Sequence, residues 1–329
     1  MNLPATTPAT TLDRQTHSPA ACAAIMFLHA ATALHPGSGT ALGVIDLPVE
    51  REPHTDWPLI PGTSLKGVLR DALRESLREK YPKRRDADRA PEVTEIFGPP
   101  TDTAADHAGA LSLTDARILA FPVRSMKGVF AWITCTDVLT RFARDVRLTG
   151  IGSSPPPAAS PGSDECFVAR GSPLEIAGQS GLLLEEFDFT AKAPPPDADT
   201  FLKAVAGMAF ADPTRRDDFL KRVVILHPDA FTHFVRHSTH VRARIALDYE
   251  TKTASDGALF YEEYLPPETI LYSLLLATHG RGSAATPASE VIRSVRRTVD
   301  SLPFLQIGAG QTVGCGICTV AFHPREEKP

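Results

Sequence analysis

The segment from residue 35 to residue 46 combines three glycines with one carboxylate. Gly37, Gly39 and Gly43 have no side chains to keep a ligand away from the backbone. Asp46 follows them, and its carboxylate could hold a divalent cation or take a proton from a reacting hydroxyl group. A lone loop aspartate before a proline also commonly caps a turn, so the residues alone leave both roles open.

Three other side chains could take part in proton transfer or in ligand binding. His35 opens the glycine-containing segment, where it could contact a phosphate, transfer a proton, or fix the loop by a hydrogen bond. Glu262 and Tyr264 lie two residues apart in the sequence FYEEY, so in a strand both side chains point to one face. They could support a bound ligand or form a satisfied pair on an edge strand.

A second glycine-rich segment lies near the C-terminus, at Gly308, Gly310, Gly314 and Gly316. Backbone N–H groups without side chains in the way suit a bent phosphate backbone. The spacing is not that of a dinucleotide-binding or P-loop fingerprint, and no Gly-Lys-Ser/Thr follows, which argues against an NTPase.

Cationic residues occur in two places that could meet phosphates. Ser64 is predicted to cap a helix with Lys66 in its first turn, where free N–H groups and the helix dipole favour an anion. Arg124 and Lys127 belong to a loop between two predicted strands, and this loop could equally be an ordinary hairpin connection.

Two groups contain residue types that bind metals, but their patterns argue against a metal site. Cys315 and Cys318 have no second cysteine pair, so alternation into a buried sheet explains them better than zinc does. His233, His237 and His240 lack the glutamate that follows the first histidine of a zincin motif.

The elements that position these residues follow from hydrophobic spacing and turn signals. Strands are predicted at 23–33, 110–121, 129–134, 241–247 and 257–265, and helices at 64–77, 136–146, 268–278 and 288–302, before a final strand. Proline-rich stretches at 151–164 and 191–199 border an inserted lobe, about 151–200, which we expect to project. This order predicts an α+β fold with a duplicated ferredoxin-like or RRM-like β-α-β-β-α-β core.

Composition limits the class of protein further. The 329 residues are 43% hydrophobic and 22% charged, which suits a folded chain. There is no apolar run long enough to span a membrane and no secretory signal, and the five cysteines form no disulfide framework, so we expect a cytoplasmic protein with no membrane partner. Residues 1–22 are predicted to be a flexible leader. The net charge of -5 is not that of a strongly basic nucleic-acid binder, so any such binding must come from local geometry.

Five sequence blocks stand out: HPGSGTALGVIDLPVERE (35–52), IPGTSLKGVLR (60–70), GALSLTDARILAFPVRSMKGVFAWITC (109–135), GALFYEEYLPPET (257–269) and IGAGQTVGCG (307–316). Together they resemble the RAMP superfamily, and within it the backbone subunit of Cmr-type (type III-B) CRISPR effector complexes. The resemblance covers about residues 23–323, leaving a tail at 324–329.

The resemblance implies a RAMP domain with a thumb-like hairpin lobe that forms a helical filament along a guide crRNA. The partners it implies are the crRNA, a complementary target RNA, further copies of the chain and the other Cmr subunits. It also implies that Asp46 is the catalytic acid and holds Mg²⁺ or Mn²⁺, that the 2′-hydroxyl attacks, that His35 lies near the site, and that Lys66 contacts guide phosphate. Two alternatives stay open: a non-catalytic scaffold that binds crRNA, and a guide-processing endonuclease that needs no metal.

Overall fold

The computed structural model describes residues 22–40, 43–152, 154–176, 181–246, 248–251, 253 and 259–324. The predicted leader, apart from residue 22, and the predicted tail after residue 324 lie outside these residues. Within the described part of the chain, no helix is both long enough and apolar enough to cross a membrane.

A ferredoxin-like core is formed by six elements that are far apart in the sequence. The strands stand in the order β14-β1-β12-β4, and every neighbouring pair is antiparallel. Helix α1 connects the first two strands of this core, and α8 connects the last two, which gives the predicted β-α-β-β-α-β order. The elements are β1 (Cys22–Ala30), α1 (Gly62–Ser76), β4 (Ala116–Arg124), β12 (Ile270–Ala277), α8 (Ala288–Asp300) and β14 (Ile317–Pro324).

The two central strands, β1 and β12, are covered by helices and are almost entirely buried. Both strands contact α8 and also α4 (Thr136–Thr149), and nearly every residue of each strand is inaccessible to solvent. A strand buried on both faces reads as a continuous apolar run and shows no alternation. The prediction of a helix at 268–278 is therefore wrong, because this apolar run is the central strand β12.

The chain between β4 and β12 extends the same sheet and does not repeat the core. The sheet continues from β4 through β5 (Phe130–Cys135), β9 (Val223–Leu226), β6 (Glu165–Val168), β8 (Phe187–Lys192) and β7 (Gly181–Leu184). Because β9 runs parallel to β5, these strands do not form the predicted second copy of the ferredoxin-like order. The segment at about 151–200 contributes β6, β7 and β8 to the far end of this sheet, and Leu184 forms a bridge with Ser125, in the turn after β4. Its projection from the core stays a prediction.

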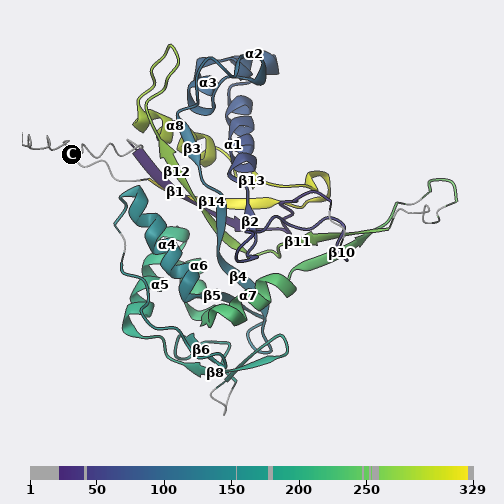
Figure 1. Ribbon diagram of the computed structural model, residues 1–329, viewed down its shortest axis with the longest axis vertical. Helices are drawn as coiled ribbons and strands as arrows, with labels where there is room; N and C mark the ends of the chain where they lie inside the picture. Colours follow the sequence, from purple (N-terminus) through teal and green to yellow (C-terminus); the bar gives the residue numbers. More distant parts are fainter. Residues whose placement is uncertain are drawn as a thin grey trace, which may run out of the picture.

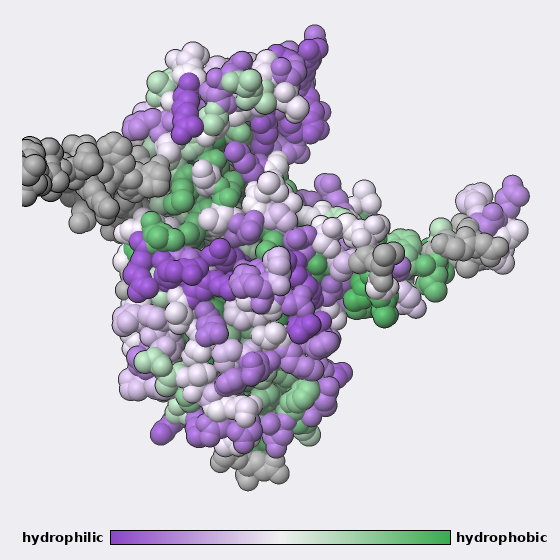
Figure 2. Space-filling view, in the orientation of Figure 1, coloured by the Kyte–Doolittle hydropathy of each residue, from purple (hydrophilic) through white to green (hydrophobic). Residues whose placement is uncertain are grey.

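The element that projects is the hairpin of β10 (His240–Arg244) and β11 (Phe260–Tyr264), which extends to the right in Figure 1. These two strands pair antiparallel with each other, as the sequence predicts. Figure 2 shows hydrophobic side chains along this hairpin, where Val241, Ile245 and Leu259 are exposed. The thumb-like element of the fold is thus this hairpin.

The remaining elements complete the two ends of the molecule. Helices α2 and α3 lie with α1 at one end of the view, and α5 and α6 lie with α4 toward the other (Figure 1). They are β2 (Leu59–Ile60), α2 (Arg84–Asp88), α3 (Pro91–Phe97), η1 (Thr101–Thr103), β3 (Leu111–Leu113), α5 (Pro196–Ala209), α6 (Pro213–Arg222), α7 (Pro228–His237), β13 (Leu305–Gln306) and η2 (Gln311–Val313).

Candidate functional site

Asp46 lies on the returning side of a narrow loop that is anchored to strand β11. The two sides of the loop meet at a bridge between Gly37 and Val49, and Gly39 adopts a φ of 99° near the exposed end. The Oδ2 atom of Asp46 accepts a hydrogen bond of 2.7 Å from the backbone N–H of Tyr261. The next residue, Leu47, forms a parallel bridge with Glu262. Asp46 is only partly buried, and its carboxylate is held at the edge of the hairpin with one oxygen engaged.

His35 is buried beneath this loop, with 5% of its surface exposed. Its Nδ1 atom donates to the carbonyl oxygen of Glu263 at 2.5 Å, and its ring lies 5.4 Å from the ring of Tyr264. A Cβ atom added at Gly37 would lie 2.7 Å from Nε2 of His35, so the glycine makes room for the imidazole. The geometry favours a loop-fixing role for His35, and its role in proton transfer stays a prediction.

Glu262 and Tyr264 form a hydrogen-bonded group with Arg244 from the partner strand. The hydroxyl of Tyr264 donates to Oε2 of Glu262 at 2.5 Å, and Arg244 donates to the same carboxylate oxygen at 2.7 Å and to the tyrosine oxygen at 2.8 Å. Burial acts to raise the pKa of Glu262, but the hydrogen bonds from Tyr264 and Arg244 outweigh it, and the pKa is lowered. Burial and the adjacent carboxylate raise the pKa of Tyr264. The group is therefore a carboxylate, a neutral phenol and a guanidinium.

On the opposite face of β11, Glu263 joins the loop to the hairpin. Its carboxylate accepts hydrogen bonds from Arg51 at 2.5 Å, from the N–H of Val49 at 3.0 Å and from Thr239 at 2.8 Å. Arg51 also donates to the carbonyl oxygen of Val235 at the end of α7. This buried group fixes the segment that carries Asp46 relative to the base of the hairpin.

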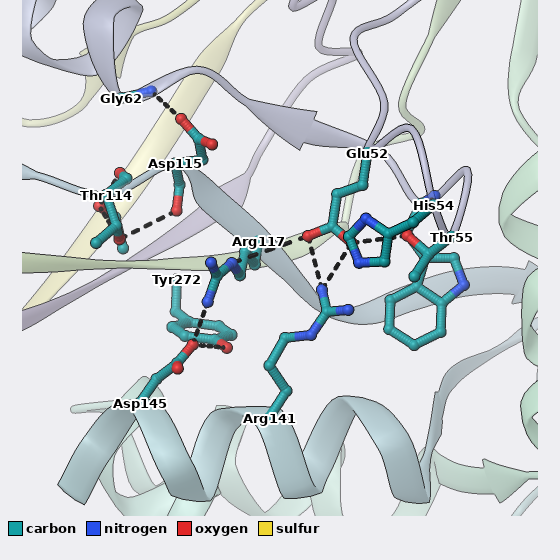
Figure 3. A network of polar contacts seen from close by, with 12 residues as sticks. Glu52, His54, Thr55, Gly62, Thr114, Asp115, Arg117, Arg141, Asp145 and Tyr272 are labelled. Carbon is teal, nitrogen blue, oxygen red and sulfur yellow. Dashed lines mark hydrogen bonds and ion pairs between the residues drawn. The ribbon is translucent and has the colours of Figure 1, made fainter. Parts of the chain in front are cut away.

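A second ionic network, shown in Figure 3, attaches the end of the same segment to helix α4. Arg141 donates to both carboxylate oxygens of Glu52, at 2.6 and 2.7 Å. Beside them, Asp145 accepts from Arg117 at 2.6 Å and from the hydroxyl of Tyr272 at 2.9 Å. The sequence block that ends in Arg51 and Glu52 thus anchors the loop at two places, once to the hairpin and once to the core.

The C-terminal glycine-rich loop lies against His35. The N–H of Ala309 donates to the carbonyl oxygen of His35 at 3.1 Å, and a Cβ atom at Gly308 would lie 2.3 Å from that oxygen. Gly308, Gly310, Gly314 and Gly316 all have φ between 76° and 81°, which side chains disfavour. The N–H groups of Gly314 and Gly316 donate within the protein, to Gln311 and Ala33. Gly308 therefore allows close contact with the His35 loop.

Helix α1 begins at Gly62, two residues earlier than predicted, so Ser64 lies in its first turn and Lys66 lies just beyond it. The residue before the helix is Pro61, so Ser64 is not the cap, and the N–H of Gly62 already donates to Asp115 at 2.8 Å. Burial, and then the nearby Arg70, lower the pKa of Lys66. The following residue, Gly67, shares a cleft of about 550 Å³ with the glycine-rich loop at Gly308.

Arg124 and Lys127 are not brought to the group around Asp46. Arg124 ends β4 and Lys127 lies in the turn between β4 and β5, beside the strands that extend the sheet. Arg124 pairs with Glu185 at 2.7 Å, and Lys127 donates to the carbonyl oxygen of Glu175 at 2.6 Å. RNA binding by these two residues stays a prediction.

Comparison with known proteins identifies the family. The sequence model of the RAMP superfamily matches residues 27–319 of this chain. The chain belongs to the RAMP superfamily. This RAMP protein is 38% identical to the CRISPR system Cmr endoribonuclease Cmr4 of Pyrococcus furiosus, over 90% of this chain and 94% of that protein. It is 23% identical to the CMR subunit Cmr4 of Saccharolobus solfataricus, over 88% of this chain and 93% of that protein.

Solved structures support the same RAMP fold. The structure of oligomeric Cmr4 from Pyrococcus furiosus matches with a TM-score of 0.69 and 29% identity, over 93% of this chain and 99% of that one. A chain of the type III-B Cmr-beta complex bound to cognate target RNA matches with a TM-score of 0.66 and 20% identity, over 92% and 98% of the two chains. The second likeness concerns the fold alone.

The donor atoms available for a metal in this RAMP protein are few. Within the described residues, no three His, Cys, Asp or Glu side chains gather in a way that could hold an ion. Cys315 and Cys318 are buried thiols, and burial raises the pKa of Cys318 to about 12. Near the loop, Asp46 is engaged through Oδ2 alone, and Glu262 is engaged through Oε2 alone. The two differ in that Glu262 is paired with the guanidinium of Arg244.

The residues that fix the site were the ones that sequence reasoning missed. Arg51, Glu263 and Arg141 hold the Asp46 loop, and Arg244 holds Glu262. A signal for Arg244 was present, because the alternation of apolar and basic residues in VRARIAL predicts basic side chains on one face of a strand. No sequence pattern links Glu52 with Arg141, since the two are brought together only by packing of the loop on α4.

Proposed function

We propose that this chain is the backbone subunit of a type III-B CRISPR effector complex, in which it binds guide crRNA and cleaves the complementary target RNA. Copies of the chain would form a filament along the guide in the cytoplasm, next to the other Cmr subunits, and cut the target at regular intervals. The observation that carries the proposal is the 38% identity to a Cmr endoribonuclease over 90% of the chain. The anchored loop at Asp46 supports it, because a cleaving group must be held in a fixed position.

Asp46 is the side chain to which we assign cleavage. The Asp46 carboxylate oxygen that Tyr261 does not engage can take the proton of a 2′-hydroxyl. The oxygen of that hydroxyl then attacks the adjacent phosphorus and displaces the 5′-oxygen of the next nucleotide, which takes up a proton from water. The hydrogen bond from Tyr261 and the bridge from Leu47 to Glu262 fix where the Asp46 oxygen points. His35, Glu262 and Tyr264 act in this scheme by holding the loop and strand β11 in place.

A divalent cation, Mg²⁺ or Mn²⁺, belongs to the proposal. One protein carboxylate is compatible with Mg²⁺, which is commonly bound by one or two carboxylates together with substrate phosphates and water. Asp46 would be the protein ligand, and the ion would supply positive charge to the scissile phosphate. Glu262 is not assigned to the ion, because its negative charge is already balanced by the guanidinium of Arg244.

The test is cleavage of a labelled complementary RNA by the reconstituted complex, with Asp46→Ala compared to the unchanged chain. Loss of a positioned acid–base group lowers rates by about 10² to 10⁴. We expect the variant to assemble and bind target but to yield no ladder of evenly spaced products. Chelator should abolish the ladder made by the unchanged chain, and added magnesium should restore it.

Glu50→Ala is a matched control, because it removes a carboxylate from the same segment while the backbone bonds of residue 50 to Pro36 and Leu59 remain. Wild-type cleavage by Asp46→Ala would place the active centre elsewhere and make this chain a scaffold for crRNA. Cleavage that continues in chelator would remove the metal from the proposal and leave the aspartate to act by proton transfer.

A further inference from the structure

Three guanidinium groups surround strand β11, and one of them has no acidic partner. Arg51 pairs with Glu263, and Arg244 pairs with Glu262. Arg242 forms no ion pair with any carboxylate in the described part of the chain. Its contacts are the ring of Tyr264, whose centroid lies 4.7 Å away, the thiol of Cys315 at 3.7 Å, and the ring nitrogens of His240 at 3.5 Å.

These contacts hold Arg242 in place without satisfying its charge. A thiol is a weak acceptor, and the distances to His240 are at the limit of hydrogen bonding. The face of an aromatic ring attracts a guanidinium and fixes its plane, but it does not serve as a hydrogen-bond acceptor for the in-plane N–H groups. A partly buried cation ordinarily has an anionic partner, so the arrangement is complete only when an anion is supplied from outside.

The position of Arg242 indicates which anion this is. Arg242 stands directly opposite Glu262 in the β10–β11 ladder, and Glu262 bridges to Leu47, the residue after Asp46. On the other side, Arg242 touches Cys315 between the glycines of the C-terminal loop. It therefore lies on the same strand pair as the proposed cleavage loop and beside a segment that lacks side chains at four positions.

We infer that Arg242 binds a backbone phosphate of RNA at the base of the β10–β11 hairpin. A planar guanidinium whose N–H groups meet only weak or distant acceptors can exchange them for two phosphate oxygens at once. Stacking on Tyr264 orients the group before RNA arrives, which lowers the entropy lost on binding. The inference rests on the proposed function for its ligand, but it concerns binding and does not depend on which residue cuts.

The experiment compares Arg242→Met with the unchanged chain in the complex reconstituted with guide RNA. Methionine keeps an apolar stem over Tyr264 and removes the charge. Affinity is measured by titration at several salt concentrations, first for the guide alone and then, with Asp46→Ala also present to prevent cutting, for the complementary target. Arg293→Met is the matched control, because it removes a guanidinium from exposed α8, where Arg293 pairs with Glu290.

Loss of one charge-assisted contact weakens binding about tenfold or more per copy, and one lost phosphate contact reduces the salt slope by about 0.7 on a single strand. We expect both changes for Arg242→Met in one of the two arms, which identifies the guide or the target as the source of the phosphate. Arg242→Lys should keep the salt slope and lose part of the RNA affinity. The positive charge remains, but the planar group that binds two phosphate oxygens at once is lost.

Unchanged affinity and slope in both arms, or changes equal to those of Arg293→Met, would overturn the inference. If Arg242→Met lowers the thermal midpoint of the chain, Arg242→Lys is the deciding variant. A normal thermal midpoint together with wild-type RNA affinity in Arg242→Lys would also overturn the inference. Failure of Asp46→Ala to stop cleavage would refute the nuclease assignment but leave the guide-binding arm unaffected, so the two failures are distinguishable.

Discussion

Removing the guanidinium of Arg141 should destabilise the fold because Glu52 would lose its main partner. Glu52 and Arg141 have side chains that are 10% and 18% exposed and are joined by two short hydrogen bonds. Removing one partner of a buried ion pair lowers the free energy of unfolding by about 3 to 5 kcal/mol. Arg117 remains 3.8 Å from Glu52, and Thr55 still donates to it at 2.7 Å. We therefore expect Arg141→Met to lower the free energy of unfolding by about 2 to 3 kcal/mol at pH 7.

Urea denaturation of four chains measures this coupling: the unchanged chain, Arg141→Met, Glu52→Gln and the double variant. The loss of unfolding free energy in the double variant should be about 2 kcal/mol smaller than the sum of the two single losses. The reason is that no unpaired charge is left buried in the double variant. Arg144→Met on the same helix is the control, since this arginine is 57% exposed and its buried partner Asp145 keeps the hydrogen bonds from Arg117 and Tyr272. Additive single changes would refute the reasoning.

The same pair predicts a dependence on pH. Burial acts to raise the pKa of Glu52, but hydrogen bonds from Arg141 and Thr55 outweigh it, so the folded-state pKa lies below its ordinary value of 4.5. A carboxyl group with a lowered pKa contributes stability that is complete above the unfolded pKa and is lost as pH falls through the folded pKa. The stability difference between the unchanged chain and Arg141→Met should shrink as the pH falls below 4.5. A difference that stays constant down to pH 3 would contradict this explanation.

Two further predictions concern the residues beside the loop. Gly308→Ala should lower stability by about 1 to 3 kcal/mol, because the new methyl group would lie 2.3 Å from the carbonyl oxygen of His35, whereas Gly67→Ala, in a helix with open space around it, should raise stability by about 0.5 to 1 kcal/mol. Thermal unfolding compares the two, and an equal effect of both changes would contradict the packing argument. Tyr264→Phe removes one hydrogen bond that lowers the pKa of Glu262, so acid unfolding should begin at a higher pH; an unchanged acid midpoint would show that Arg244 alone sets that pKa.

Local patterns predicted most of the elements but not the order in which they join. The apolar run at β1, the spacing of α1 and α8, and the alternation in β10 each depend on neighbouring residues, and these elements are confirmed. The strand β12 was predicted as a helix because burial on both faces removes the alternation that marks a strand. The pairing of the 151–200 strands with β9 was not predicted, because proline-rich borders show where a segment begins and ends, not what it pairs with.

The candidate site shows the same limit. Asp46, His35, Glu262 and Tyr264 were selected from resemblance and residue type, and the structure places them around strand β11. Whether each acts on RNA or only supports the loop depends on hydrogen-bond partners far away in the sequence. A single sequence does not show such pairs, because nothing local relates one member to the other.

The order of the central strands has a consequence for how the protein is made. A ribosome synthesises β1 first, yet both strands that border it, β12 and β14, begin at residue 270 or later. The apolar strand β1 therefore emerges long before either of its hydrogen-bonding neighbours exists, and an unpaired apolar strand readily associates with other chains. A chain that stops before residue 270 lacks both β12 and β14, the two strands that pair with β1 at the centre of the sheet. Correct folding of this protein is thus decided in the last stage of its synthesis.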